Sequence, residues 1–183
     1  MRRAATALLA GLLAASVAAA AVAAARHPVP DVTRLDPRVL VLRDPAASPD
    51  IRALARNPRV AGAGVSRAFT SYGDVTGDGR PDALVQVRSG GAAGTVAYFV
   101  YAVRDGRVRD VLPVNDVFGA DVAIVAGRIV QRLPLWSARD APCCPARVAI
   151  TVFRWDDGHM ATQASSTRPL HGPGQDFRRR ALN

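Results

Sequence analysis

Three short turn sequences, each bounded by segments rich in Val, Ile, Tyr and Phe, constrain the fold of this chain most strongly. They are Asp105-Gly106, Ala126-Gly127 and Asp156-Asp157-Gly158. Asp-Gly between two β-forming runs is a strong signal for a tight hairpin loop. From residue 60 onward the apolar residues recur with a period of two, as they do in strands. Consecutive hairpins predict an antiparallel meander.

The fold class that follows is mainly β (α+β), an antiparallel β-meander of about seven strands with one short N-terminal helix. The segments that read as strands are 66–71, 82–88, 95–104, 107–114, 121–125, 128–133, 147–155 and 159–163.

The single helix is predicted directly before the strands. Ser48 has the side chain of an N-cap, Pro49 suits the first helical position, and Asp50 complements the positive end of the helix dipole. Asn57-Pro58 ends the helix, because the residue before a proline avoids the α region. The apolar stripe of this helix is expected to cover one face of the meander.

Residues 1–25 are typical of an export signal. Met1-Arg2-Arg3 is a positive start, and residues 4–25 are apolar or small, with alanine cleavage sites at their end. The apolar run is longer than that of an ordinary signal and approaches the length of a membrane span, so an uncleaved anchor over residues 4–25 is the alternative. The expected localisation is secreted or cell envelope.

Two further parts flank the β-rich globular domain, which is predicted over 48–163. Residues 26–47 contain four prolines and are expected to form a linker, with at most one short strand at 38–43. Residues 164–183 are rich in Ser, Pro, Gly and Arg without any period, and are expected to form a disordered basic tail.

Charge and composition exclude some classes of function. Every basic residue is Arg, every acidic residue is Asp, and the net charge is +9. The arginines are scattered and no basic face is interleaved with aromatic residues, so no nucleic-acid partner is expected. The chain has no Glu, no G-x-S-x-G and no H-E-x-x-H. No catalytic residues are therefore assigned, and the partner is unknown, with cell-envelope components as candidates.

The acidic segment 72–82 has the clearest chemistry in the sequence. It alternates oxygen-bearing side chains around Gly77 and Gly79, and Ca²⁺ takes six to eight oxygen ligands. In the counting of an EF-hand the twelfth position is Val85, so the bidentate Glu is missing and the predicted Ca²⁺ site is weak. The candidate ligands are Asp74, Thr76, Asp78, Asp82 and the backbone carbonyl of Arg80. The alternative is a Gly-rich turn whose aspartates form Asx turns, with Arg80 or Arg67 neutralising the charge.

This loop resembles the Asp-x-x-x-Asp-Gly-x-x-Asp loops of FG-GAP and VCBS repeats, which link two strands and bind calcium. The resemblance covers 74–82 only, and a propeller, which needs four or more blades, is excluded by a single copy. A broader resemblance over about 65–161 rests on "TGDGRPDALV", "YFVY", "CCP" and "VFRWDDG". These strings look like secreted actinobacterial proteins and lipoproteins of unknown function, including LppP/LprE-like ones. That resemblance implies an envelope or secreted location and brings no catalytic residues.

Cys143 and Cys144 are the only two cysteines. In an oxidising compartment thiols pair, so we predict a disulfide between these neighbours, although adjacent Cα atoms are closer than a disulfide prefers. Free or buried thiols, intermolecular bonds and redox chemistry remain open, although the usual C-x-x-C spacing is absent.

The function that these features favour is an exported, non-enzymatic β-rich envelope domain that binds or scaffolds, with calcium as a stabilising ion. The alternatives are a secreted enzyme of unrecognised class and a thiol-redox protein that uses Cys143 and Cys144.

Overall fold

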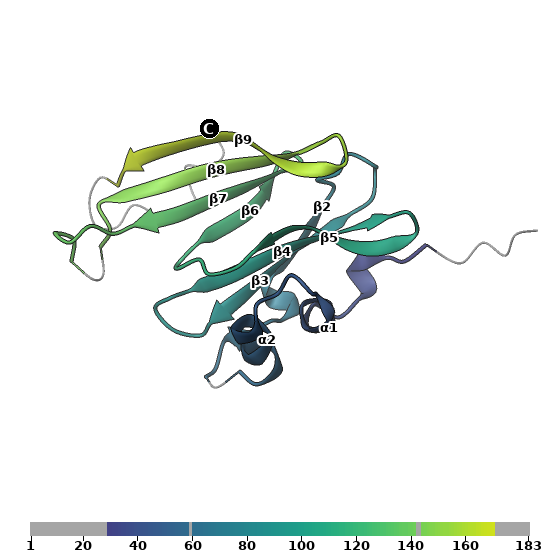
Figure 1. The fold of residues 1–183 in the computed structure, drawn as a ribbon, viewed down its shortest axis with the longest axis horizontal. Helices are drawn as coiled ribbons and strands as arrows, with labels where there is room; N and C mark the ends of the chain where they lie inside the picture. Colours follow the sequence, from purple (N-terminus) through teal and green to yellow (C-terminus); the bar gives the residue numbers. More distant parts are fainter. Residues whose placement is uncertain (1–28, 59, 142–143, 171–183) are drawn as a thin grey trace, which may run out of the picture.

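The structure is a computed structural model and describes residues 29–58, 60–141 and 144–170. Over these residues the protein is mainly β, with nine strands in two antiparallel sheets and two α-helices (Figure 1). The mainly β class and the antiparallel pairing are therefore confirmed. The single meander of about seven strands is replaced by two sheets.

The first sheet has the order β1-β3-β4-β5, and β2 also pairs with β3. Its strands are β1 (Ala63–Gly64), β2 (Thr70–Gly73), β3 (Asp82–Ser89), β4 (Thr95–Arg104) and β5 (Arg107–Val114). Both short strands pair with β3 at its two ends, β2 opposite its first residues and β1 opposite its last. The loop from Gly73 to Asp82 is therefore closed by pairing at its own base.

The second sheet is a four-stranded meander in the order β6-β7-β8-β9. Its strands are β6 (Asp121–Val125), β7 (Arg128–Leu135), β8 (Arg147–Asp156) and β9 (His159–Pro169). The predicted turns at Ala126-Gly127 and Asp156-Asp157-Gly158 join these strands, and Ala126 and Asp157 adopt positive φ. The hairpin signals of the sequence thus located this sheet correctly.

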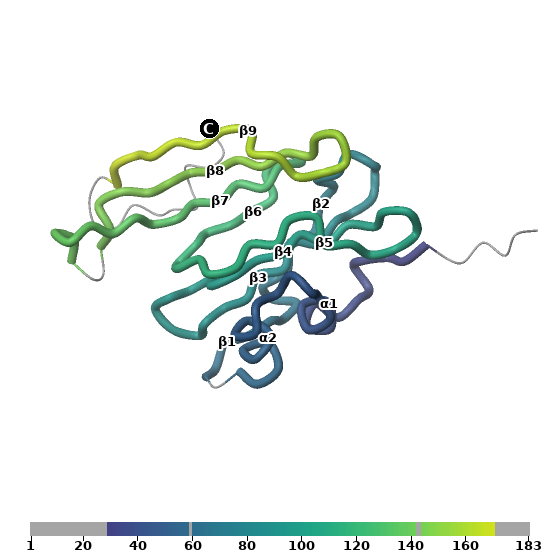
Figure 2. The backbone as a smooth tube through the Cα atoms, viewed as in Figure 1, coloured from purple at the N-terminus to yellow at the C-terminus, as the bar shows by residue number. Residues whose placement is uncertain are grey.

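The two helices cover one face of the first sheet. They are α1 (Pro37–Arg43) and α2 (Pro49–Arg56), preceded by a short 3-10 turn η1 (Val32–Arg34). Figures 1 and 2 show them on the opposite side of the first sheet from the second sheet. The core between the helices and the sheet contains Val32, Val41, Ala47, Ile51, Ala55, Ala83, Val85, Val87, Ala97, Phe99 and Tyr101.

The other face of the first sheet packs on the second sheet. This second core contains Val75, Leu84, Tyr98, Val100, Ala120, Val122 and Ile129. Because β3 and β4 are buried on both faces, their sequences are almost continuously apolar instead of alternating. Residues 97–102 of β4 are all buried for this reason.

The expected linker over 26–47 is wrong where the structure describes it. Residues 37–43 form the helix α1, not a strand, and Val41 is fully buried. Asp36 accepts a hydrogen bond from the backbone N–H of Arg38 and Pro37 occupies the first turn, so this helix begins, like α2, with a side-chain cap followed by a proline. The sequence analysis missed this helix because Val39 and Val41 are β-branched and favour a strand. The described part of the chain thus has two helices before the main strands instead of one.

Two other boundaries also differ from the sequence prediction. The expected strand at 66–71 begins as the 3-10 turn η2 (Arg67–Phe69), and only Thr70–Gly73 pairs. Residues 164–169, assigned to a disordered tail, continue β9 and pair with β8 as far as Arg147 opposite Pro169. Most of these side chains are exposed, so the segment shows no apolar pattern from which a strand could be predicted. Its strand conformation depends on backbone pairing with β8. The export segment 1–25 and residues 171–183 lie outside the described residues.

Candidate functional site

Asp82 closes the acidic loop from its C-terminal end. As the first residue of β3 it is 1% exposed, and its Oδ2 accepts hydrogen bonds from the backbone N–H groups of Val75 and Thr76 at 2.9 and 3.0 Å. Burial raises the pKa of Asp82, while the bonds from these two N–H groups lower it and the nearby charge of Asp78 adds to the rise. The residue therefore fixes the loop to the sheet.

Asp74 organises the opposite side of the loop. Its Oδ1 accepts from the N–H of Gly77 at 2.6 Å and its Oδ2 accepts from the N–H of Gly79 at 2.9 Å. Both glycines have φ above 70°, a conformation that other residues adopt at a cost. Asp78 Oδ1 accepts from the N–H of Arg80 at 3.0 Å, which is an Asx turn. The loop thus contains an Asx turn at Asp78.

Thr76 is the one candidate ligand with an unsatisfied polar atom. Its side chain is 7% exposed, and its hydroxyl has no partner at hydrogen-bonding geometry. The hydroxyl is nevertheless close enough to the Asp82 carboxylate to lower the pKa of that group. The structure thus brings Thr76 and Asp82 together in a buried corner, whereas Asp78 and Arg80 are exposed.

The described residues contain no group of three His, Cys, Asp or Glu side chains placed to hold a metal ion. Arg67, considered as a neutralising partner of the loop, donates instead to the carbonyls of Thr33 and Leu35 at 2.8 and 3.1 Å. Calcium binding by Asp74, Thr76, Asp78, Arg80 and Asp82 therefore stays a prediction. The site would need its carboxylates to serve a cation in addition to the loop N–H groups.

Cys144 forms a disulfide bond, and Cys143 lies outside the described residues. The cysteines belong to the connection between β7 and β8, which is organised by Asp140. Its carboxylate accepts from the N–H of Ser137 and of Ala146 at 2.9 and 3.0 Å, and from the Ser137 hydroxyl at 2.8 Å. These bonds, that from Ala146 first, lower the pKa of Asp140. The pairing of Cys143 with Cys144 stays a prediction.

An exposed aromatic pair joins the start of that connection to the segment before β6. Phe118 and Trp136 are 52% and 39% exposed, their ring centroids are 5.3 Å apart, and the rings meet edge to face at 81°. Gly119 approaches the Trp136 ring closely, because a Cβ there would be 3.7 Å from this ring and 3.3 Å from Pro134. Sequence reasoning missed this pair, since its members are far apart in the chain and neither belongs to a motif.

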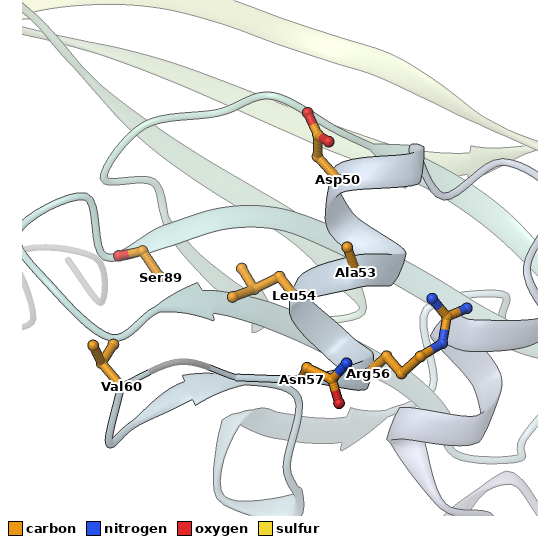
Figure 3. A pocket seen from close by; sticks show the side chains of 7 residues that line it. All are labelled: Asp50, Ala53, Leu54, Arg56, Asn57, Val60 and Ser89. Carbon is orange, nitrogen blue, oxygen red and sulfur yellow. The ribbon is translucent and has the colours of Figure 1, made fainter.

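A hollow of about 460 Å³ lies beside α2 (Figure 3). Its lining residues are Asp50, Ala53, Leu54, Arg56, Asn57, Val60 and Ser89. Figure 3 shows Asp50 and Arg56 at opposite ends of the helix, with Leu54 between them. The charged groups of the hollow thus do not converge on one point, and no chemistry is assigned to it.

Comparison with protein-family models, with curated proteins and with solved structures found no match. The likeness to FG-GAP, VCBS and LppP/LprE-like proteins therefore stays an expectation from the sequence. The class that the structure itself defines is a mainly β protein with two antiparallel sheets and one helical layer. Within the described ranges, no helix combines the length and the apolar character that crossing a membrane requires.

Proposed function

We propose that this chain is an exported, non-enzymatic binding domain of the cell envelope, and that its contact surface includes Phe118 and Trp136. The observation that carries the proposal is the exposure of these two large side chains in a fixed edge-to-face pair. Covering exposed apolar area favours association, and the loss of freedom on binding offsets part of that gain. Aromatic side chains held in place also lose little conformational entropy on binding.

The partner that this surface fits is an anionic polysaccharide of the envelope. The rings offer apolar faces for the C–H faces of sugars. The net charge is +9 for the full chain and +7 once Arg2 and Arg3 are removed with the export segment, and it attracts a polyanion. Positive charge lies near the pair as well. Arg139 follows Trp136 by three residues, and Arg147 is opposite Leu135 in the register of β7 and β8. Both arginines are exposed.

Tryptophan fluorescence tests the proposal directly, because the chain has only two tryptophans. The variant Trp155→Phe leaves Trp136 as the sole reporter. Its counterpart Trp136→Phe leaves Trp155, which lies on β8 of the second sheet and stacks against Arg104 of β4. We expect a uronic-acid or phosphate-bearing polysaccharide to change the emission of Trp136 in a saturable way and to leave Trp155 unchanged. Dextran, which is neutral, serves as the matched polymer.

Phe118→Ala provides the specificity control for this titration. Its side chain is half exposed, so the variant should fold normally and bind the polyanion at least several-fold more weakly. A response to anionic vesicles without one to the polysaccharides would contradict the proposed partner. The absence of any response would contradict the binding surface itself.

The proposal includes export through residues 1–25. Cleavage after this segment gives a mature protein that begins close to Arg26. N-terminal sequencing of protein recovered from culture supernatant checks this expectation. An intact Met1 terminus in the membrane fraction would replace secretion with anchoring by residues 4–25.

The proposal also includes one weak Ca²⁺ ion in the loop between β2 and β3, with a stabilising role. Two features of the corner support it, namely the buried hydroxyl of Thr76 without a partner and the desolvated carboxylate of Asp82. A cation would compensate both groups. Without a bidentate Glu, the dissociation constant is expected to be on the order of 10⁻⁴ to 10⁻³ M.

A further inference from the structure

Two carboxyl groups meet under the helical layer, far from the acidic loop in sequence. Asp44 is the C-cap of α1 and is 5% exposed. Asp110 lies on β5, directly opposite Tyr101 of β4 in the register of the sheet. The phenol of Tyr101 donates a 2.8 Å hydrogen bond to Asp44 Oδ2. The side chain of Asp44 is also close enough to that of Asp110 for a hydrogen bond and for repulsion between their charges. The proposed binding function uses neither residue.

One oxygen of Asp110 would have no hydrogen-bond partner if the side chain were ionised. Its Oδ2 is buried and accepts no hydrogen bond from any described residue, while Oδ1 accepts from the N–H of Leu112 at 3.1 Å. An ionised carboxylate only accepts hydrogen bonds, whereas a protonated one also donates. The neighbouring group, Asp44, is itself an acceptor. A proton on Asp110 that is donated to Asp44 satisfies both groups.

The hydrogen bonds indicate which of the two groups holds the charge. Asp44 accepts from the Tyr101 phenol and from the N–H of Ala46, both at 2.8 Å, so each of its oxygens has a donor, whereas Asp110 Oδ2 has none. Burial raises the pKa of Asp110 to about 8, and the charge of Asp44 and the hydrogen bond to it add to the rise. Asp44 is thus the carboxylate and Asp110 the acid.

The other charged groups around the pair do not neutralise it. Arg52 of α2 donates to the backbone carbonyl of Asp44 at 3.0 Å and not to its carboxylate. Arg43 and Arg109, the chain neighbours of Asp44 and Asp110, are exposed. Burial raises the pKa of Tyr101 above its usual value, and the hydrogen bond to Asp44 raises it further, so the phenol stays a donor.

The pair fastens the connection between α1 and α2 to an edge strand. Further along this connection, Asn115 accepts from the N–H of Ser48 at 3.0 Å and donates to the carbonyl of Ala46 at 3.0 Å. Asn115 directly follows β5, which is the last strand of the first sheet. Polar contacts at both ends of the connection thus hold the helical layer on β5.

We propose that Asp44 and Asp110 share one proton that locks the connection between α1 and α2 onto β5, and that loss of this proton in alkaline solution loosens the helical layer. Deprotonation leaves two buried negative charges side by side, which repel each other. The folded form holds this proton more tightly than the unfolded chain does. The resulting stability is complete below the unfolded pKa, about 3.9, and is lost as the pH rises through about 8.

Urea denaturation of the full chain between pH 5 and 8.5 tests the lock, with Asp110→Asn as the variant. The amide of Asn donates to Asp44 at every pH. Across pH 5–7 we expect the ratio of the wild-type to the variant folding constant to fall roughly tenfold per pH unit. Asp82, whose pKa is also raised, contributes equally to both proteins and cancels in this ratio. A ratio that is independent of pH would overturn the proposal.

A second measurement needs no variant. The ¹³C carboxyl shift of Asp110 in the wild-type protein should titrate near pH 8, and a midpoint near 4 would overturn the proposal. Amide-exchange protection of Ala46 and Ser48, corrected for intrinsic exchange, should fall above pH 8 in the wild type and persist in Asp110→Asn. Unchanged protection in the wild type would show that the connection is not released.

Discussion

Tyr98 of β4 donates a 2.6 Å hydrogen bond to the side-chain oxygen of Gln131 on β7, and this bond joins the two sheets inside their common core. Tyr98 is fully buried and Gln131 is 9% exposed. Burial raises the pKa of Tyr98 above its usual value, which keeps the phenol a donor. A satisfied polar pair in an apolar core favours one packing of the sheets over others.

Removing the donor of this pair should destabilise the protein. Tyr98→Phe keeps the ring but leaves the Gln131 oxygen buried without its partner, which costs about 1–3 kcal/mol. Urea denaturation measures the loss. Tyr72→Phe is the matched control, since Tyr72 is 37% exposed on β2. Removing its hydroxyl should change the free energy of unfolding by less than about 0.5 kcal/mol. Equal stability of the two variants would show that the buried bond makes no net contribution.

Asp82 should be the stability-determining residue of the acidic loop. Asp82→Ala leaves the N–H groups of Val75 and Thr76 without their acceptor, at a cost of about 1–3 kcal/mol for each buried donor. Asp82→Asn keeps an acceptor oxygen and should recover much of that loss. Chemical denaturation of both variants checks the expectation. If the Asn variant is as unstable as the Ala variant, the charge of Asp82 and not its acceptor role stabilises the loop.

Calcium should raise the melting temperature if the loop binds it. At millimolar calcium and a dissociation constant ten times lower, the gain is RT ln 11, roughly 1.4 kcal/mol. Asp78→Ala should abolish the gain while the fold is retained, because Asp78 is exposed and, among the described residues, its side chain accepts only from the N–H of Arg80. Thermal melts with calcium, magnesium and chelator provide the measurement. Coincident wild-type melts up to several millimolar calcium would leave the loop as a turn without a cation.

Substitution by alanine should destabilise the protein at Gly90 but not at the adjacent Gly91. A Cβ at Gly90 would clash with Val60 Cγ2 and lie 2.9 Å from Ala63, and the residue has φ of +79°. Gly90→Ala should therefore cost at least about 1–2 kcal/mol from the left-handed backbone conformation, before the clash with β1 is counted. A Cβ at Gly91 meets nothing within 4 Å, so Gly91→Ala should be close to neutral. Similar denaturation midpoints for the two variants would contradict this contact.

Cys143 and Cys144 should be linked to each other in the exported protein. Non-reduced protein should then take up no alkylating reagent, and reduction should expose two thiols per chain. Intact-mass measurement before and after reduction gives the count. Two reactive thiols in oxygen-exposed, non-reduced protein would end the assignment, and a dimer that reduction dissolves would replace it with an intermolecular bond.

The strands around tight turns were predictable because their signals are local. The bounds of β4, β5 and β6 coincide with the ranges predicted from the sequence. The turn residues between them, such as Asp105 and Gly106, adopt the positive φ that the hairpin signal requires. The start of α2 was equally local, since Ser48 accepts from the N–H of Ile51 as an N-cap does. Each of these features depends only on residues a few positions apart.

The candidate site was likewise only partly predictable from the sequence. The oxygen-bearing residues of the loop are visible in the sequence, but only the structure shows that Asp82 is buried and that Asp74 spends both oxygens on loop N–H groups. The exposed pair of Phe118 and Trp136 had no signal at all. Its two members belong to the connections before β6 and after β7, and they meet only because these strands pair.

The sequence by itself determined the turns, the cap of α2, most strand boundaries and the order of the hairpins, because backbone conformation at these positions follows from neighbouring residues. Tertiary structure decided which segments were covered. It made 37–43 a helix with Pro37 and Val41 buried, extended β9 to Pro169 by pairing with β8, and divided one expected meander into two sheets. It also brought Asp44 against Asp110 from positions remote in the chain. Burial and pairing partners are set by residues distant in sequence, and no local pattern encodes them.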